Sequence, residues 1–107
     1  MNGQNITICG VNYEIINADD HFDVDTHFGQ VDYLHGKIIL NNSMSESVRN
    51  ETLCHEILHA MLVYIGRSDL SEDETFVCAL GNAINQTFRI KDDAICKGQK
   101  VSDGTEN

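Results

Sequence analysis

The stretch "NETLCHEILHAMLV", residues 50–63, places two histidines four positions apart in a largely apolar run, with a glutamate directly after the first. The run predicts one helix that begins after Ser43 or Ser45 and stops at Gly66. Its apolar residues recur with a period of about 3.6, at Leu53, Ile57, Leu58, Met61, Leu62 and Ile65. Because they cover nearly every side, we expect this helix to lie at the centre of the core.

The chain before this helix alternates apolar and polar residues. Residues 5–19, "NITICGVNYEIINAD", predict two short strands around Cys9-Gly10, and residues 29–42, "GQVDYLHGKIILNN", repeat the pattern around His35-Gly36. We therefore expect a small antiparallel sheet of two hairpins. The acidic stretch between them, which holds His21 and His27, predicts a loop.

A second amphipathic helix follows after a short connection. Ser71 with Glu74 three residues later forms a capping-box pattern. The apolar stripe behind it consists of Phe76, Val77, Leu80, Ile84 and Phe88. The two helices must be neighbours, because the connection is too short to separate them. We predict an α+β domain over residues 1–90 and a polar, flexible tail over residues 91–107.

Composition excludes several classes of function. The 107 residues carry seven Lys+Arg against seventeen Asp+Glu, a formal net charge of −10, with no basic cluster. Direct nucleic-acid binding and attachment to an anionic membrane are therefore not expected. We predict a soluble cytoplasmic protein, because neither a secretory signal pattern nor a long apolar run occurs. The cysteines should be reduced, and three of them should be small buried residues: Cys9, Cys54 and Cys78, with Cys96 in the tail.

The HEILH motif has the spacing of a metal site. His55 and His59 project from one face of a helix and can place two imidazole nitrogens on a single ion. Glu56 lies one residue round the cylinder, where it can take a proton from a water that the ion activates. The alternative is a pair of half-buried histidines satisfied by other partners. A polar cluster in so apolar a helix would be costly without a function.

A hydrolytic zinc site needs a third protein ligand and one open position. Glu74 is the first candidate, because its spacing to Val77 directs its side chain toward the first helix. Its capping role would compete with this ligation. Glu72 and Asp73 are expected to favour the helix dipole. The other candidate ligands are Asp73, Cys78 and the loop histidines His21 and His27.

The segment "HEILHAML" within "QVDYLHGKIILNNSMSESVRNETLCHEILHA", residues 30–60, resembles the small zincin metallopeptidases of the ImmA/IrrE class, which are common in phages and mobile elements. The resemblance extends over about residues 28–90. In that class the acidic ligand usually has alanine three positions later, whereas the residue three positions after Glu74 is Val77.

This resemblance implies a minimal zincin-like fold, Zn²⁺ as cofactor, and hydrolysis of a protein or peptide, which in some members is a transcriptional repressor. His55, His59 and Glu74 would bind the metal, and Glu56 would be the catalytic base. The strand "GKIILNN", residues 36–42, would receive substrate as an added strand. Tyr33, His35 and Tyr64 are candidate donors to the oxyanion.

Two other classes of function compete with a peptidase. The first is a catalytically silent metal-binding phage component, and the second is an acidic interaction or inhibitor protein that uses its negative charge. The intact Glu56 favours an enzyme over the silent component, because this residue is dispensable for binding zinc.

Overall fold

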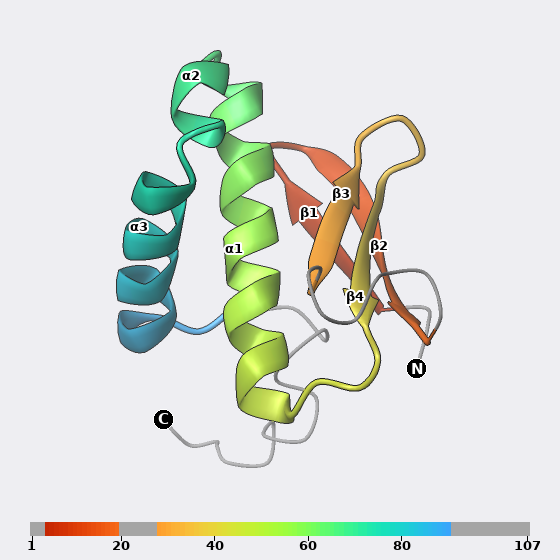
Figure 1. Ribbon diagram of the computed structural model, residues 1–107. Helices are drawn as coiled ribbons and strands as arrows, with labels where there is room; N and C mark the ends of the chain where they lie inside the picture. Colours follow the sequence, from red (N-terminus) through yellow and green to blue (C-terminus); the bar gives the residue numbers. More distant parts are fainter. Residues whose placement is uncertain (1–3, 20–27, 91–107) are drawn as a thin grey trace, which may run out of the picture.

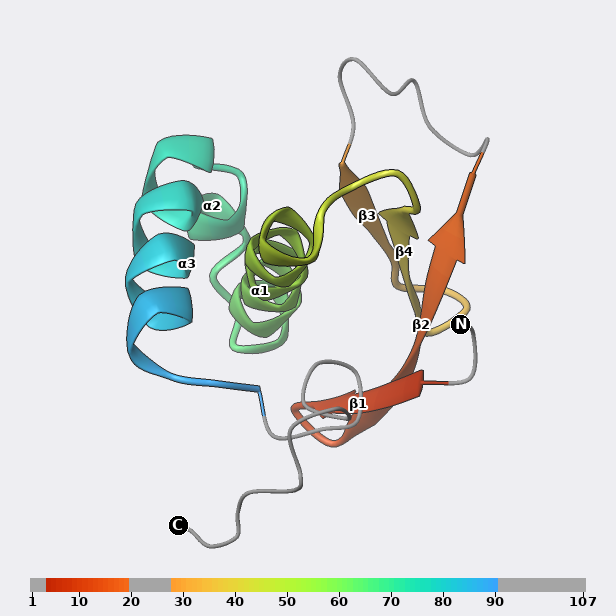
Figure 2. The ribbon, with the colours of Figure 1, turned by 90° about the horizontal axis from the view of Figure 1, so that it is seen from below.

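A computed structural model describes residues 4–19 and 28–90 and shows an α+β arrangement in which a central helix lies between a sheet and two further helices. Viewed along its axis, α1 separates the sheet from α2 and α3 (Figure 2). The elements are β1 (Gln4–Ile8), β2 (Val11–Ala18), β3 (Gly29–Asp32), β4 (Lys37–Asn41), α1 (Glu46–Tyr64), α2 (Ser68–Ser71) and α3 (Glu74–Thr87) (Figure 1). None of the described helices is both long and apolar enough to cross a membrane.

The four strands form a mixed sheet in the order β1-β2-β4-β3. The two predicted hairpins are present as antiparallel pairs, β1 with β2 and β3 with β4. The prediction of a wholly antiparallel sheet was wrong, because β2 and β4 pair in parallel, with Ile15 opposite Ile38. Each hairpin therefore contributes its second strand to the middle of the sheet. As a result β4 has a neighbour on both sides, and β3 is the edge strand next to α1.

The hairpin turns depend on backbone conformations with positive φ. Cys9 and Gly10, at φ 49° and 86°, join β1 to β2 as predicted. In the other hairpin β3 ends at Asp32, so Tyr33, which was predicted in the strand, belongs to the turn. The Asp32 carboxylate accepts a hydrogen bond from the His35 backbone N–H at 3.1 Å and contacts its Nδ1 at 2.9 Å.

Helix α1 matches its prediction closely. The Ser45 hydroxyl caps its start, accepting from the Val48 N–H, and Gly66 follows its end at φ 84°. One side of α1 packs on the sheet through Leu53 and Ala60. Another side packs on α2 and α3 through Leu58 and Leu62. The helix is therefore the centre of two apolar clusters, as its all-round apolar sequence predicted.

The second predicted helix is divided in two, and its capping box is absent. Helix α3 begins at Glu74, and Asp73 is the N-cap, because its carboxylate accepts from the Phe76 N–H at 3.1 Å. Ser71 instead ends the short helix α2. Asp73 has taken the capping role, so the expected competition between capping and metal ligation does not arise at Glu74.

The cysteines differ in environment. Cys54 is buried, as predicted, and burial raises the pKa of its thiol. The same prediction was wrong for Cys9, which is exposed in a hairpin turn, and for Cys78, which is exposed on α3. The histidines His21 and His27, the cysteine Cys96 and the predicted tail 91–107 lie outside the described residues.

Gly29 lets β3 approach α1 closely. A Cβ atom at this position would lie 3.0 Å from Cγ2 of Thr52 and 3.3 Å from Cγ of Glu56. On the strand side it would lie 3.1 Å from Cδ2 of Leu40, which is fully buried. The side chain of Glu56 therefore lies directly against the start of the edge strand, and no larger residue fits there without displacement.

We expect Gly29→Ala to lower the free energy of unfolding by about 1 kcal/mol, because the added methyl overpacks a filled site. Thr52→Ser in the Gly29→Ala background removes the nearest methyl and should restore part of the loss. Urea denaturation of the four members of this double-mutant cycle measures both effects. Additive losses for the two substitutions would contradict a direct contact between positions 29 and 52.

Candidate metal centre

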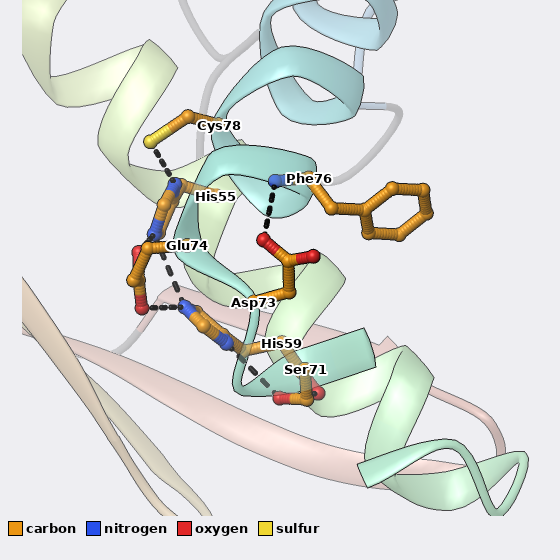
Figure 3. A network of polar contacts seen from close by, with 7 residues as sticks. All are labelled: His55, His59, Ser71, Asp73, Glu74, Phe76 and Cys78. Atoms are coloured by element: carbon orange, nitrogen blue, oxygen red, sulfur yellow. Dashed lines mark hydrogen bonds and ion pairs between the residues drawn. The ribbon is translucent and has the colours of Figure 1, made fainter. Parts of the chain in front are cut away.

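The structure brings together His55, His59 and Glu74 at the junction of α1 and α3 (Figure 3). Nε2 of His55 lies 3.1 Å from Oε1 of Glu74, and Nε2 of His59 lies 3.1 Å from Oε2 of the same carboxylate. The two Nε2 atoms are themselves 3.1 Å apart. Both imidazoles are mostly buried, whereas the glutamate side chain is 66% exposed. Three potential ligand atoms thus converge from two helices.

The triad fits the requirements of a metal ion. Ligand bonds of about 2.0 to 2.2 Å in tetrahedral geometry place neighbouring ligand atoms about 3.3 to 3.6 Å apart. The observed separations of 3.1 Å are slightly shorter. Two imidazoles and one carboxylate are also an established ligand set of catalytic zinc. The group can therefore hold a metal ion.

Ser71 determines which nitrogen of His59 faces the site. The Ser71 hydroxyl donates to the backbone carbonyl oxygen of His59 at 3.3 Å. The proton of the hydroxyl is thereby committed, so Oγ accepts from Nδ1–H of the His59 ring at 3.0 Å. A neutral imidazole protonated at Nδ1 has its lone pair on Nε2, which is the atom that faces His55 and Glu74. This arrangement prepares His59 as a ligand.

His55 has a weaker contact on its far side. Its Nδ1 lies 3.8 Å from Sγ of Cys78, one turn beyond Glu74 on α3. Burial lowers the pKa of His55, and the neighbouring His59 lowers it further. The neutral form of the imidazole, which is the form that binds metals, is therefore favoured. Cys78 thus lies behind a ligand and not among the three converging atoms (Figure 3).

Glu56 is a buried carboxyl group beside the triad. It is 9% exposed, and no hydrogen bond or ion pair within residues 4–19 and 28–90 engages its carboxylate. Burial raises its pKa to about 7, and the Glu74 carboxylate adds to the rise. Buried polar groups nearly always have partners, so an unpartnered carboxyl next to two histidines indicates a functional position.

A cavity of about 730 Å³ opens over these residues. One wall is the edge strand β3 with the residues that flank it, the floor is α1, and the other wall is α3. His55, Glu56, His59 and Glu74 all line it. The cavity therefore gives a ligand access to the triad and to the unpartnered carboxyl at the same time.

Of the other residues predicted from the sequence, some have structural roles elsewhere and one lines the cavity. Asp73 is the α3 cap and does not join the triad. His35 serves its hairpin turn, and the Tyr64 hydroxyl contacts that of Tyr13. Of the three candidate oxyanion donors, only Tyr33 lines the cavity. Burial raises the pKa of Tyr33, with a further contribution from the Glu56 carboxylate.

Sequence reasoning missed two contributors to the site. Ser71 was assigned to a capping box, and the sequence around it, "RSDLSEDE", carries no signal that it will contact His59. Gly29 did carry a signal, since an isolated glycine in a strand often marks a close approach of backbone.

Comparisons with models of protein families, with curated proteins and with solved structures found no match.

We expect Glu74→Gln to lose most of its affinity for zinc, because removing one of three ligands should weaken metal binding by orders of magnitude. Asp73→Asn should retain most of the affinity, since Asp73 is outside the triad and the asparagine side-chain oxygen can still cap α3. Cys78→Ser should lie close to the parent. Competition with a chromophoric chelator measures all four proteins. Equal affinity of Glu74→Gln and the parent would remove Glu74 from the site.

Ser71→Ala should lower zinc affinity about 10- to 100-fold, as expected when a metal-binding histidine loses the partner of its other nitrogen. Ser68→Ala provides a matched control in the same short helix, because Ser68 is exposed. Nitrogen-15 shifts of the His59 ring should report the Nδ1–H tautomer in the parent and a mixture in Ser71→Ala. The same tautomer ratio in both proteins would refute the role of Ser71.

Proposed function

We propose that the protein is a small zinc-dependent metallopeptidase of the zincin type. The observation that carries this proposal is the convergence of His55, His59 and Glu74 beside the buried, unpartnered Glu56, all open to one cavity. Two imidazoles, one carboxylate and an adjacent free carboxyl are the parts that metal-assisted hydrolysis requires. The resemblance of the HEILH segment to the ImmA/IrrE class supports the same proposal.

Each residue has a definite chemical role in this proposal. Bound zinc would supply Lewis acidity, polarising the scissile carbonyl and lowering the pKa of a water to about 7. Glu56 accepts the proton of the attacking water and then transfers it to the leaving amine. Burial raises the pKa of Glu56 to about 7, so the carboxyl can both accept and release a proton near neutral pH. Tyr33 can donate a hydrogen bond to the developing oxyanion from the cavity wall.

The edge strand β3 is the surface on which an extended peptide would pair. The sequence favoured β4 for this role, but β4 is bonded to β2 and β3 on its two sides and has no free edge. Strand β3 pairs only with β4 within the described sheet and forms a wall of the cavity. A peptide added along β3 would present its carbonyl groups toward the triad.

The features of Glu56 also bear on the competing functions. A silent metal-binding protein would gain nothing from an unpaired carboxyl that is 9% exposed beside the triad. An interaction protein that relied on net charge alone would not require converging ligand atoms. The first alternative leaves Glu56 without an explanation and the second leaves the triad without one, whereas hydrolysis uses both.

Purified protein should contain about one zinc ion per chain by elemental analysis. A chelator should remove the ion and lower the melting temperature, because a ligand that binds only the native state stabilises it by mass action. Adding zinc should reverse the shift. A preparation that contains no divalent transition metal and takes up none on addition would contradict the proposal.

Glu56→Gln keeps the shape of the side chain and removes the proton acceptor. We expect it to retain zinc and to hydrolyse peptides at least about 10²-fold more slowly than the parent, the scale typical of losing a general base. Relief of an unpaired buried carboxyl should leave its stability equal or higher. Full activity of Glu56→Gln, with normal zinc content, would show that another group accepts the proton.

A further inference from the structure

Glu51 lies on α1 in line with the two histidines of the triad, and the proposed hydrolysis does not use it. Glu51, His55 and His59 are each four positions apart, so they follow one another along the same face of the helix. Glu51 lines the cavity. Within residues 4–19 and 28–90 no hydrogen bond or ion pair engages its carboxylate. It is a free negative charge one turn beyond the metal ligands.

Two other residues that line the cavity complement a long cationic side chain. Asn82 lines the same cavity two turns beyond Glu74 on α3, and its amide oxygen can accept hydrogen bonds. Phe28 also lines it and is 53% exposed, directly before Gly29, which packs on Thr52 beside Glu51. A carboxylate, an amide and an exposed ring suit the charge and the aliphatic stem of lysine or arginine.

The charge of the whole cavity has the same sign. Its described lining contains the three carboxylates Glu51, Glu56 and Glu74 and no lysine or arginine. Glu74 faces two histidines and Glu56 is buried, so Glu51 carries the uncompensated charge at the cavity surface. The net charge of −10 adds a long-range attraction for cationic ligands.

We propose that the Glu51 end of the cavity is a subsite for a lysine or arginine side chain, so that the substrate is a basic peptide segment. This inference rests on the proposed peptidase function. The subsite is formed by Phe28, Glu51 and Asn82, and the unpartnered, 9% exposed Glu56 lines the same cavity.

The direction of β3 places this subsite relative to the cleaved bond. The strand begins at Gly29 beside Thr52, and the turn that follows it brings the Tyr33 ring to 6.5 Å from that of Tyr64. A peptide antiparallel to β3 therefore runs from the Tyr33 end to the Phe28 end. The basic residue then lies on the C-terminal side of the scissile bond.

Binding can be tested with ten-residue Ala-Gly-Ser peptides that differ at one position, which is lysine, glutamine or glutamate. The full chain carrying Glu56→Gln keeps the peptides intact, and amide shifts of Glu51 and Asn82 report binding. We expect the lysine peptide to bind about three- to fivefold more tightly than the glutamine peptide, as for an exposed charge pair. Adding Glu51→Gln should abolish this preference, and Glu51→Lys should reverse it toward glutamate. Glu46→Gln, on the same helix but outside the cavity lining, should leave it unchanged.

Cleavage by the parent enzyme tests the placement. In a mixture of random decapeptides, we expect lysine or arginine to be enriched on the C-terminal side of the cleaved bonds, and Glu51→Lys to remove the enrichment. Cleavage without this enrichment overturns the placement. Equal binding of the three peptides, failure of the lysine peptide to bind, or a preference that survives Glu51→Gln overturns the subsite. If no peptide is cut, the peptidase proposal fails and the binding measurement still decides the subsite.

Discussion

The burial of α1 on two sides is the constraint on which the rest of the structure depends. Its apolar residues pack against the sheet on one side and against α2 and α3 on another. A strip of α1 between β3 and α3 remains open to polar side chains and faces the cavity. Glu51, His55 and His59 lie on this strip, with Glu56 next to it. The position of the candidate site is a direct consequence of how the helix is packed.

The same packing explains why the polar residues of the site are arranged so closely. A carboxylate with two imidazoles, and a second carboxyl with no partner, are costly to hold in a partly apolar environment. Such a cost of stability is typical of functional sites and is offset by the apolar contacts of α1. Ser71 and Cys78 contact the far nitrogens of the two histidines and so limit the rotation of both rings.

Much of this could be predicted from the sequence because the signals were local. The HEILH spacing fixes the relative positions of His55 and His59 once the segment is helical, and the apolar run indicated a central helix. The parallel pairing of β2 with β4 could not be predicted, because it joins segments from different hairpins and no turn specifies it. The α3 cap was assigned to Ser71 because Ser71 and Asp73 are both good capping residues, and tertiary contact with His59 decides between them.

The segment from Ser71 to Cys78 provides one member of the triad and the contacts behind both histidines. The apolar contact that joins α3 to α1 is modest, with Val77 as its fully buried side chain. Local opening of α3 would therefore separate Glu74 from the histidines, and an ion bound by all three would oppose that opening with the part of its binding free energy that depends on Glu74. Amide hydrogen exchange in α3 and metal occupancy of the triad therefore both report the same local opening equilibrium.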